Sequence, residues 1–437
     1  MSGNFREYIQ RGSHLTKNQG VWSEDYNTTD LKAFEKRVEE LFPDMFNHDF
    51  PQSVISTASN PKLYSDPEYA EDVKNEIFTN QLLYFWEFSP SFWGKKIPEV
   101  TKLTKAQIIN QDYSFKGRDR SREEIVSLLA SHGDDWRNAV NSKDALIDPL
   151  KEYDNLVYKK SSGSTSDNPI IMPMSPLDYL MTIKMGVPYY ENRGLDMTDS
   201  DVLFFGYPEL VDHSAFMSLA RQIYTHMGGN VTFAMDYAPK DSDVFKNARN
   251  MYGAGIPNNE RIGAFMRSGK NKFMVGGNFS FQQMALSMEK RIAEGEEVRP
   301  IKSKLIIGGG SKNPMIWSAE LLRKNFVENP KLYIKSEGVN VINAYGDTLR
   351  KIQSVASDDD RFFVNPLEDL VFRKPGAVGL VKQGEGLEMI VNDYSTSVLG
   401  TTVPGDKVTI VRDSEGNLII TEIGRMKKQE MIYGCFN

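Results

Sequence analysis

The stretch Leu305-Ile306-Ile307-Gly308-Gly309-Gly310 has the pattern of a buried strand that ends in a glycine-rich turn. The residues after it predict a helix from about Pro314 to Phe326, and Val341-Ile342-Asn343-Ala344 has the pattern of a second buried strand. A strand–helix–strand unit of this kind predicts a parallel sheet with helices on its faces. Ligands of such sheets bind beyond the carboxyl ends of the strands, where the glycine-rich turn lies.

A second unit of the same kind precedes the first. Val202-Leu203-Phe204-Phe205 is expected to form a strand, Ser214–Met227 a helix that ends at Gly228-Gly229, and Val231–Met235 the next strand. The expected fold class is therefore α/β, with parallel sheets flanked by helices.

The pattern divides the rest of the chain into further portions. A helix is predicted from Leu31 to Phe42, behind the candidate caps Thr28, Thr29 and Asp30. After residue 376 the sequence predicts short strands at Ala377–Val381, Leu387–Asn392, Lys407–Arg412 and Leu418–Glu422, with a turn at Gly384-Glu385-Gly386. We therefore expect a helix-rich N-terminal portion (1–150), an α/β core (151–375), a β-rich subdomain (376–423) and a hinge with a mobile tail (424–437).

The overall composition limits the function classes. The 437 residues can form roughly two or three domains, and the net charge of -7 argues against a protein that coats nucleic acid or an anionic membrane. A single cysteine excludes an internal disulfide and argues against a structural zinc cluster. No apolar signal region and no run of transmembrane length is present, so we expect a cytoplasmic protein without a membrane span.

The hydroxyl-rich stretch from Lys160 to Pro169 is predicted to be a loop between two strands, because apolar residues flank it on both sides. Its small donors, with Gly163 free to take a positive φ, suit the spread charge of a polyphosphate. The loop lacks the Gly-Lys-Ser/Thr ending of a Walker loop, which argues against a P-loop NTPase. On this stretch alone, a polar surface turn is the favoured interpretation.

Other candidate residues carry weaker signals. Gly253-Ala254-Gly255 lacks the third glycine of the dinucleotide fingerprint, and the chain has neither His-Glu-x-x-His nor Gly-x-Ser-x-Gly. His213 is predicted to lie in a loop just past the strand at 202–206, where it could face a ligand or serve as a core histidine. The Gly308-Gly309-Gly310-Ser311 segment could be a tight turn or a bare surface for a flat base.

The order of these segments is informative. The hydroxyl-rich loop, the strand-end histidine and the triple glycine are followed by Asn343–Thr348, by Pro404-Gly405-Asp406 and by Gly424-Arg425. This series resembles the motifs of the acyl-adenylate-forming enzymes, the superfamily of acyl-CoA ligases and luciferases. The resemblance spans roughly residues 155–430.

The resemblance implies an ATP site and a magnesium ion. It implies phosphate contacts from Ser161, Ser162, Gly163, Ser164 and Thr165, adenine contacts from Gly309, Gly310, Tyr345 and Gly346, and ribose contacts from Asp406 and Arg425. Thr348 would contact the α-phosphate. Thr348 and His213 would both be catalytic residues. The family usually has a magnesium-binding Glu where this chain has Leu349, so Asp347 is the nearest substitute.

The last residues narrow the resemblance further. Together with Asn392–Ser397, they resemble the acyl-protein synthetase of the bioluminescence fatty-acid reductase system, which lacks a full C-terminal lid domain. The resemblance to the superfamily implies a pivot at Lys427, and the resemblance to the synthetase implies an acyl-accepting thiol at Cys435. A thiolate reacts readily with a mixed anhydride, although a lone cysteine can equally be an inert buried residue. A truncated acyl- or aryl-CoA ligase of the phenylacetate-CoA ligase kind would end near the same point.

The function predicted from these observations is ATP-dependent activation of a fatty or aryl carboxylic acid to acyl-AMP, followed by transfer to a thiol. The thiol would belong to Cys435, or to a partner such as an acyl-protein reductase or a carrier protein. Two alternatives stay open, namely formation of a CoA thioester and a non-catalytic protein that binds nucleotide.

Overall fold

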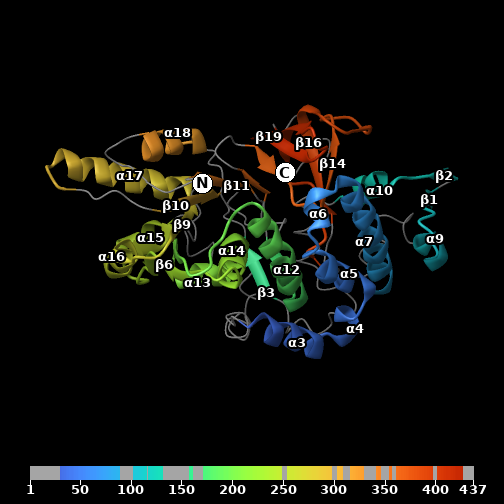
Figure 1. Cartoon of the computed structure of the whole chain (residues 1–437), viewed down its shortest axis with the longest axis horizontal. Coiled ribbons are helices and arrows are strands. Elements are labelled where there is room, and N and C mark those ends of the chain that lie inside the picture. The colour runs from blue at the N-terminus through green and yellow to red at the C-terminus, as the bar shows by residue number, and fades with distance from the viewer. Residues whose placement is uncertain are drawn as a thin grey trace.

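The computed structural model describes residues 30–88, 102–115, 117–130, 157–160, 171–248, 253–297, 303–308, 315–328, 341–345, 354–356, 361–396 and 401–426. Among these residues, thirteen strands form one mixed sheet in the middle of the molecule (Figure 1). Its parallel part runs in the order β6 (Asn230–Phe233), β5 (Asp201–Phe204), β9 (Lys272–Gly277), β10 (Lys304–Gly308) and β11 (Val341–Tyr345). The predicted α/β class is confirmed.

Helices cover both faces of the parallel strands because most of these strands are nearly continuous apolar runs, whose successive side chains point to opposite faces. Phe204 packs with α12 (Pro176–Asn192), α13 (Pro208–His213) and α14 (Ala215–His226). Leu203, its neighbour, points to the opposite face and packs with α16 (Asn259–Arg267), α17 (Asn278–Ala293) and α18 (Ala319–Arg323). α18 continues into the π-helical turn η5 (Lys324–Glu328).

The predicted helix boundaries hold in one case and need correction in the other. α14 lies within the predicted range, with the Ser214 side chain as its cap and Gly228 at a φ of 88° just past its end. The helix expected from Pro314 begins only at Ala319. The Ser318 hydroxyl accepts the amide of Leu321 at 3.1 Å and so caps the helix there.

The second half of the sheet is antiparallel and confirms the predicted β-rich portion. Beyond β11 the order is β12 (Ser354–Ala356), β13 (Phe362–Phe363), β19 (Leu418–Arg425), β18 (Asp406–Arg412), β16 (Gly384–Asp393), β14 (Glu368–Arg373) and β15 (Leu380–Val381), with β17 (Thr401–Thr402) paired to β16. Two expectations were wrong. β14 precedes residue 376, and Gly384–Gly386 belongs to β16, where a register shift and positive φ angles let the strand bend.

Most of the described residues between 30 and 130 are helical. The helices are α3 (Leu31–Leu41), α4 (Pro43–Phe46), α5 (Asp49–Thr57), α6 (Lys62–Ser65), α7 (Pro67–Phe88), α9 (Lys105–Ile109) and α10 (Arg122–Leu129). Asp30 caps α3 by accepting the amides of Lys32 and Ala33. These helices share one core with α12 and with residues 367–403 of the β-rich portion, and they gather at the end of the molecule away from α17 and α18 (Figure 1).

Three small two-stranded sheets and one short helix complete the described chain: β1 (Ser114–Phe115) with β2 (Arg118–Asp119), β3 (Val157–Lys160) with β4 (Ile171–Met174), β7 (Met235–Tyr237) with β8 (Gly255–Pro257), and α15 (Asp243–Asn247). A helix long and apolar enough to cross a membrane does not occur in the described ranges.

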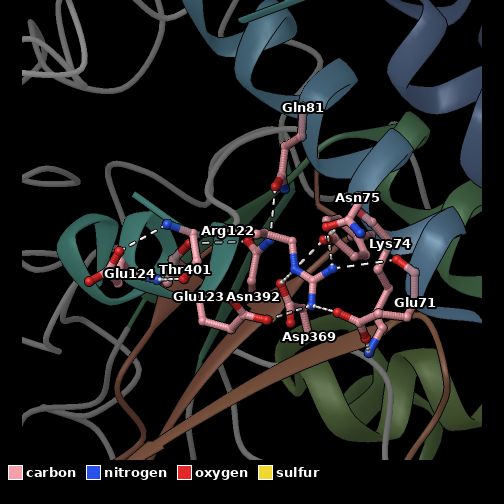
Figure 2. A network of polar contacts seen from close by, with 12 residues as sticks. Glu71, Lys74, Asn75, Gln81, Arg122, Glu123, Glu124, Asp369, Asn392 and Thr401 are labelled. Carbon is pink, nitrogen blue, oxygen red and sulfur yellow. Dashed lines mark hydrogen bonds and ion pairs between the residues drawn. The ribbon is translucent and has the colours of Figure 1, made fainter. Parts of the chain in front are cut away.

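A buried polar network connects the N-terminal helices to the β-rich strands (Figure 2). Arg122 of α10 pairs with Asp369 of β14 at 2.9 Å and with Glu71 of α7, and it donates to the Asn75 amide oxygen at 2.8 Å. Burial alone would lower the pKa of Arg122, but the acidic groups around it, Asp369 first and then Tyr394, Glu71 and Glu123, together outweigh burial and raise the pKa.

The segment Asn392–Ser397 takes part in the same connection. The Asn392 side chain donates to Gln81 of α7 at 3.0 Å and accepts from the Thr401 hydroxyl at 3.1 Å (Figure 2). The Tyr394 hydroxyl donates to the backbone oxygen of Lys74 at 3.2 Å. The described part of this motif therefore holds helix α7 against the sheet.

Candidate functional site

The parallel strands end together at one edge of the sheet, as the strand–helix–strand pattern predicted. Gly308, the last residue of β10, stands level with Ala344 of β11 and Gly277 of β9. The predicted adenine-binding residues therefore follow directly from two neighbouring strand ends. Gly309 comes immediately after β10, and Tyr345 is itself the last residue of β11.

The hydroxyl-rich segment itself lies outside the described residues, but the two strands predicted to flank it are present and pair with each other. β3 and β4 are antiparallel, with Lys160 opposite Ile171, so residues 161–170 form the connection between them. β3 lies beside α13, the helix that follows β5. The flanks of the segment are thus close to the chain that leaves the carboxyl edge of the sheet.

The position predicted for His213 needs correction. His213 is the last residue of helix α13, which begins at Pro208, and not part of a loop. Pro208 at the first helical position starts this turn, since its fixed φ suits a helix and it has no amide hydrogen to leave unpaired. The structure describes only the backbone of His213.

Two of the predicted ATP-binding residues are in direct contact. The Tyr345 hydroxyl donates a hydrogen bond to Oδ2 of Asp406, 61 residues further along the chain. The Asp406 side chain is almost wholly buried, with the residue 2% exposed, whereas Tyr345 is half-buried. A buried carboxylate is costly unless hydrogen-bond donors surround it, and Tyr345 provides one such donor.

The contact requires the sheet to curl. β11 and β18 are separated by β12, β13 and β19, so they are four strand spacings apart. In a flat sheet this distance would be about 19 Å, much longer than a tyrosine side chain. The curl therefore brings the carboxyl edge of the parallel strands to the start of β18, and Tyr345 and Asp406 meet at this junction.

Backbone geometry positions Asp406 at the first residue of its strand. Gly405 has a φ of 74°, a left-handed conformation that favours glycine, and its carbonyl accepts the amide of Met426 at 3.1 Å. The backbone of Asp406 lies opposite that of Arg425 in the β18–β19 ladder. Arg425 is the last residue of β19, and its side chain is not described.

The Tyr345 ring has its own support. Tyr345 pairs with Ser354 across β11 and β12, and its ring meets Phe362 edge-on with centroids 6.1 Å apart. Nothing in the sequence indicated Phe362 as part of this site, and no spacing rule links Tyr345 to Asp406. Only the family motifs placed the two residues at one nucleotide.

The remaining candidate residues lie outside the described part of the chain, and their roles stay predictions. They are Ser161, Ser162, Gly163, Ser164, Thr165, Gly309, Gly310, Gly346, Asp347, Thr348, Lys427 and Cys435. Within the described ranges, no cluster of three or more His, Cys, Asp or Glu side chains could hold a metal ion. That finding does not bear on Asp347.

A cavity of about 420 Å³ lies elsewhere, between α5, α7 and α9. His48, Glu76, Glu87 and Lys105 are among its lining residues. Burial lowers the pKa of His48, although Glu87 and Asp49 favour the charged form. Because the imidazole Nδ1 accepts the Phe50 amide at 3.1 Å, the histidine acts as the cap of α5.

Comparisons with known proteins support the fold. A scan against protein-family models finds no match, and a search of curated proteins finds none either. Among solved structures, the chain is similar to 2-hydroxyisobutyryl-CoA ligase in the postadenylation state in complex with 2-HIB-AMP, with a TM-score of 0.56 and 11% identity over 83% of this chain and 68% of the ligase chain.

The same ligase in complex with 2-HIB-AMP and CoA gives a TM-score of 0.55 and 13% identity over 84% of this chain and 70% of the ligase chain. An ATP-bound RpMatB-BxBclM chimera gives a TM-score of 0.40 and 14% identity over 60% of this chain, and the match spans only 47% of the chimera. That score is too low to carry an argument. At these identities the ligase structures establish a shared fold and nothing finer.

Proposed function

We propose that the protein activates a carboxylic acid with ATP, as an adenylate-forming acid–thiol ligase. The observation that carries the proposal is the contact between Tyr345 and Asp406. The family resemblance assigns these residues to adenine and ribose, and they meet where the carboxyl edge of the parallel sheet reaches the β-rich portion. The shared fold with a ligase crystallised with an acyl-adenylate is consistent with this assignment.

In the first half-reaction, a carboxylate oxygen of the acid would attack the α-phosphorus of ATP. An acyl–oxygen–phosphorus bond forms, the bond from the α-phosphorus to the bridging oxygen breaks, and pyrophosphate leaves. The main obstacle is electrostatic, because two anions must approach each other. We propose that donors from Ser161–Thr165 and Thr348 stabilise the charge on the phosphates.

A magnesium ion would further neutralise the phosphates when bound. Magnesium prefers hard oxygen ligands and is usually held by one or two carboxylates together with substrate phosphates. The carboxylate of Asp347 meets that requirement, whereas the hydrocarbon side chain of Leu349 cannot. We therefore assign Asp347 as the protein ligand.

In the second half-reaction, a thiolate would attack the acyl carbonyl and release AMP. We propose Cys435 as the first acceptor, as in an acyl-protein synthetase, with Lys427 as the pivot that lets the tail move. Passage to a reductase or carrier protein would follow. Coenzyme A as the direct acceptor is the alternative, and it would make the protein a ligase of the phenylacetate-CoA ligase kind.

One observation favours a second candidate function. Leu349 stands where the family usually has its magnesium-binding glutamate, which suits a protein that binds nucleotide without turnover. Isotope exchange between pyrophosphate and ATP, measured over a panel of short, long and aromatic acids, separates the two functions. The proposal predicts acid-dependent exchange with at least one acid, and ATP binding without any exchange would support the non-catalytic alternative.

A further inference from the structure

We propose that the cavity between α5, α7 and α9 binds an α-amino acid with a cationic side chain, of which arginine is the example tested below. The cavity has a volume of about 420 Å³, which lies in the range of small-molecule sites in proteins. None of the residues assigned to ATP is among its lining residues. The proposal is therefore independent of the proposed function.

One face of helix α7 forms a wall of the cavity. The α7 residues that line it are Glu76, Thr79, Asn80, Leu83, Trp86 and Glu87. Their spacing of three and four residues places them on one side of the helix. Glu76 and Glu87 are eleven residues apart in the chain, which corresponds to about 16 Å along the helix axis. The cavity therefore has an acidic residue toward each end of this wall, with Leu83 between them.

The charged groups around the cavity do not pair with one another. Lys105 of α9 lines it together with Asp49, Glu76 and Glu87. Among the residues that the structure describes, no ion pair or hydrogen bond joins the Lys105 ammonium to any of these carboxylates. On the preceding turns of the same helix, by contrast, Glu71 pairs with Lys74 at 2.9 Å. Charges of both signs are thus left open to a ligand.

A basic amino acid carries the complementary set of charges. The cavity presents three carboxylates and one ammonium, whereas arginine has two cationic groups and one carboxylate. Lys105 would bind the α-carboxylate, Glu87 the α-ammonium and Glu76 the cation of the side chain. Each charge of the ligand then lies beside an opposite charge, which favours this ligand over a simple amine or a simple acid.

His48 and Glu87 mark the end that would bind the α-amino and α-carboxyl groups. Nδ1 of His48 accepts the Phe50 amide at 3.1 Å, so the neutral ring carries its proton on Nε2. Nε2 lies 3.9 Å from the Glu87 carboxylate, which is too far for a hydrogen bond. Burial and, to a smaller extent, the Lys105 ammonium lower the pKa of His48. Two donors, His48 and Lys105, thus lie near the acceptor Glu87, as the adjacent carboxylate and ammonium of an amino acid require.

Apolar surface lies along the cavity between its charged groups. Leu83, Trp86 and Ile109 line it, and Trp86 is 45% and Ile109 54% exposed. The alkyl stem of an arginine can pack on such side chains while its charged end stays in water. A guanidinium also binds favourably over an indole ring. The lining therefore suits a long cationic side chain that extends toward Glu76.

The experiment is isothermal titration calorimetry of the full chain with L-arginine and three analogues that each lack one charge. Agmatine lacks the α-carboxylate, citrulline lacks the cation of the side chain, and N-acetyl-arginine lacks the α-ammonium. Loss of one ion pair at a partly exposed site weakens binding by up to about fivefold. We expect L-arginine to have the lowest Kd of the four, and this Kd should rise with salt because exposed charges are screened.

Variants assign each contact to its residue. Lys105→Met should raise the Kd for L-arginine about threefold to fivefold but not the Kd for agmatine, which has no carboxylate to lose. Glu76→Gln should raise the Kd for L-arginine to a similar extent but not the Kd for citrulline. The matched controls are Lys102→Met and Asp72→Asn, since both residues are exposed, lie one turn or less away in the chain and do not line the cavity. Neither control should change any of these affinities.

Each outcome decides for or against the proposal. It is wrong if L-arginine shows no saturable binding, or if agmatine, citrulline or N-acetyl-arginine binds as tightly as L-arginine. It is also wrong if Lys105→Met and Glu76→Gln leave the Kd for L-arginine unchanged, because the ligand would then bind elsewhere. Pyrophosphate exchange tests the proposed function separately, so either proposal can fail without the other.

Discussion

Removing the guanidinium of Arg122 should destabilise the whole molecule strongly, because this side chain connects α10 to β14 and α7. The Arg122 side chain is 5% exposed, and that of its partner Asp369 is 2% exposed. Replacing Arg122 by methionine keeps most of the volume and leaves the Asp369 carboxylate without its counter-charge. Breaking a buried ion pair in this way costs about 3–5 kcal/mol.

The measurement is the thermal unfolding midpoint, with chemical denaturation as a second probe. The matched control is Arg37→Met, because Arg37 pairs with Glu40 at 3.6 Å on the surface and both side chains are about half exposed. Exposed pairs contribute at most about 1 kcal/mol. Arg122→Met should therefore lower the midpoint several times more than Arg37→Met.

A double substitution tests the mechanism behind this effect. Adding Asp369→Leu to Arg122→Met removes the buried carboxylate that has lost its counter-charge. The double variant should therefore be more stable than Arg122→Met alone. Equal destabilisation by Arg122→Met and Arg37→Met would refute the assigned role of the buried pair. So would a double variant whose loss equals the sum of the two single losses.

Three further predictions concern other parts of the chain. Gly163→Val should abolish acid-dependent pyrophosphate exchange and shift the unfolding midpoint by only a few degrees, since surface loops tolerate substitution; normal exchange would remove the loop from the site. Cys435→Ala should retain exchange but lose the hydroxylamine-sensitive acyl adduct seen by intact mass with an acid that exchanges, and an adduct that persists would place the acyl group elsewhere. The pKa of His48 is lowered by burial from its usual 6.5, so its contribution to stability is complete above that pH and is lost as the pH falls toward the lower folded value. His48→Asn, which keeps a cap acceptor, should flatten part of that decline in pH-dependent unfolding, and an unchanged decline would contradict the assignment.

The sequence predicts best the strands whose buried side chains are apolar. β10 and β11 consist largely of aliphatic residues, and β5 likewise shows a continuous apolar run. An apolar run of this kind predicts a buried strand without any knowledge of the residues that contact it in the fold. The parallel sheet and its carboxyl edge could therefore be predicted before any contact was known.

β14 could not be predicted in the same way, because it begins with two buried acids. Glu368 and Asp369 interrupt the apolar pattern, and Asp369 is compensated by Arg122, which lies far away in the sequence. In β16, the glycines at 384 and 386 look like a turn but occur where the strand changes register. Both cases depend on tertiary contacts that local patterns do not contain.

In the candidate site, too, sequence motifs identify residues, whereas their contacts depend on the tertiary fold. The motif order suggested that Tyr345 and Asp406 belong to one nucleotide, but their hydrogen bond depends on the curl of the sheet between β11 and β18. The contact of Tyr345 with Phe362 likewise joins residues that no sequence spacing connects. Sequence motifs could therefore name these two residues, and only the fold shows that they are in contact.

In the proposed reaction a carboxylate attacks the α-phosphorus of ATP, so one of its oxygens must pass to AMP. The most direct test uses an acid that supports exchange, labelled with ¹⁸O in its carboxyl group, with hydroxylamine as the acyl acceptor. We expect one labelled oxygen in the AMP that is released, because the carboxyl oxygen stays on the α-phosphorus when the acyl group leaves. Label in inorganic phosphate together with ADP, or unlabelled AMP, would contradict it.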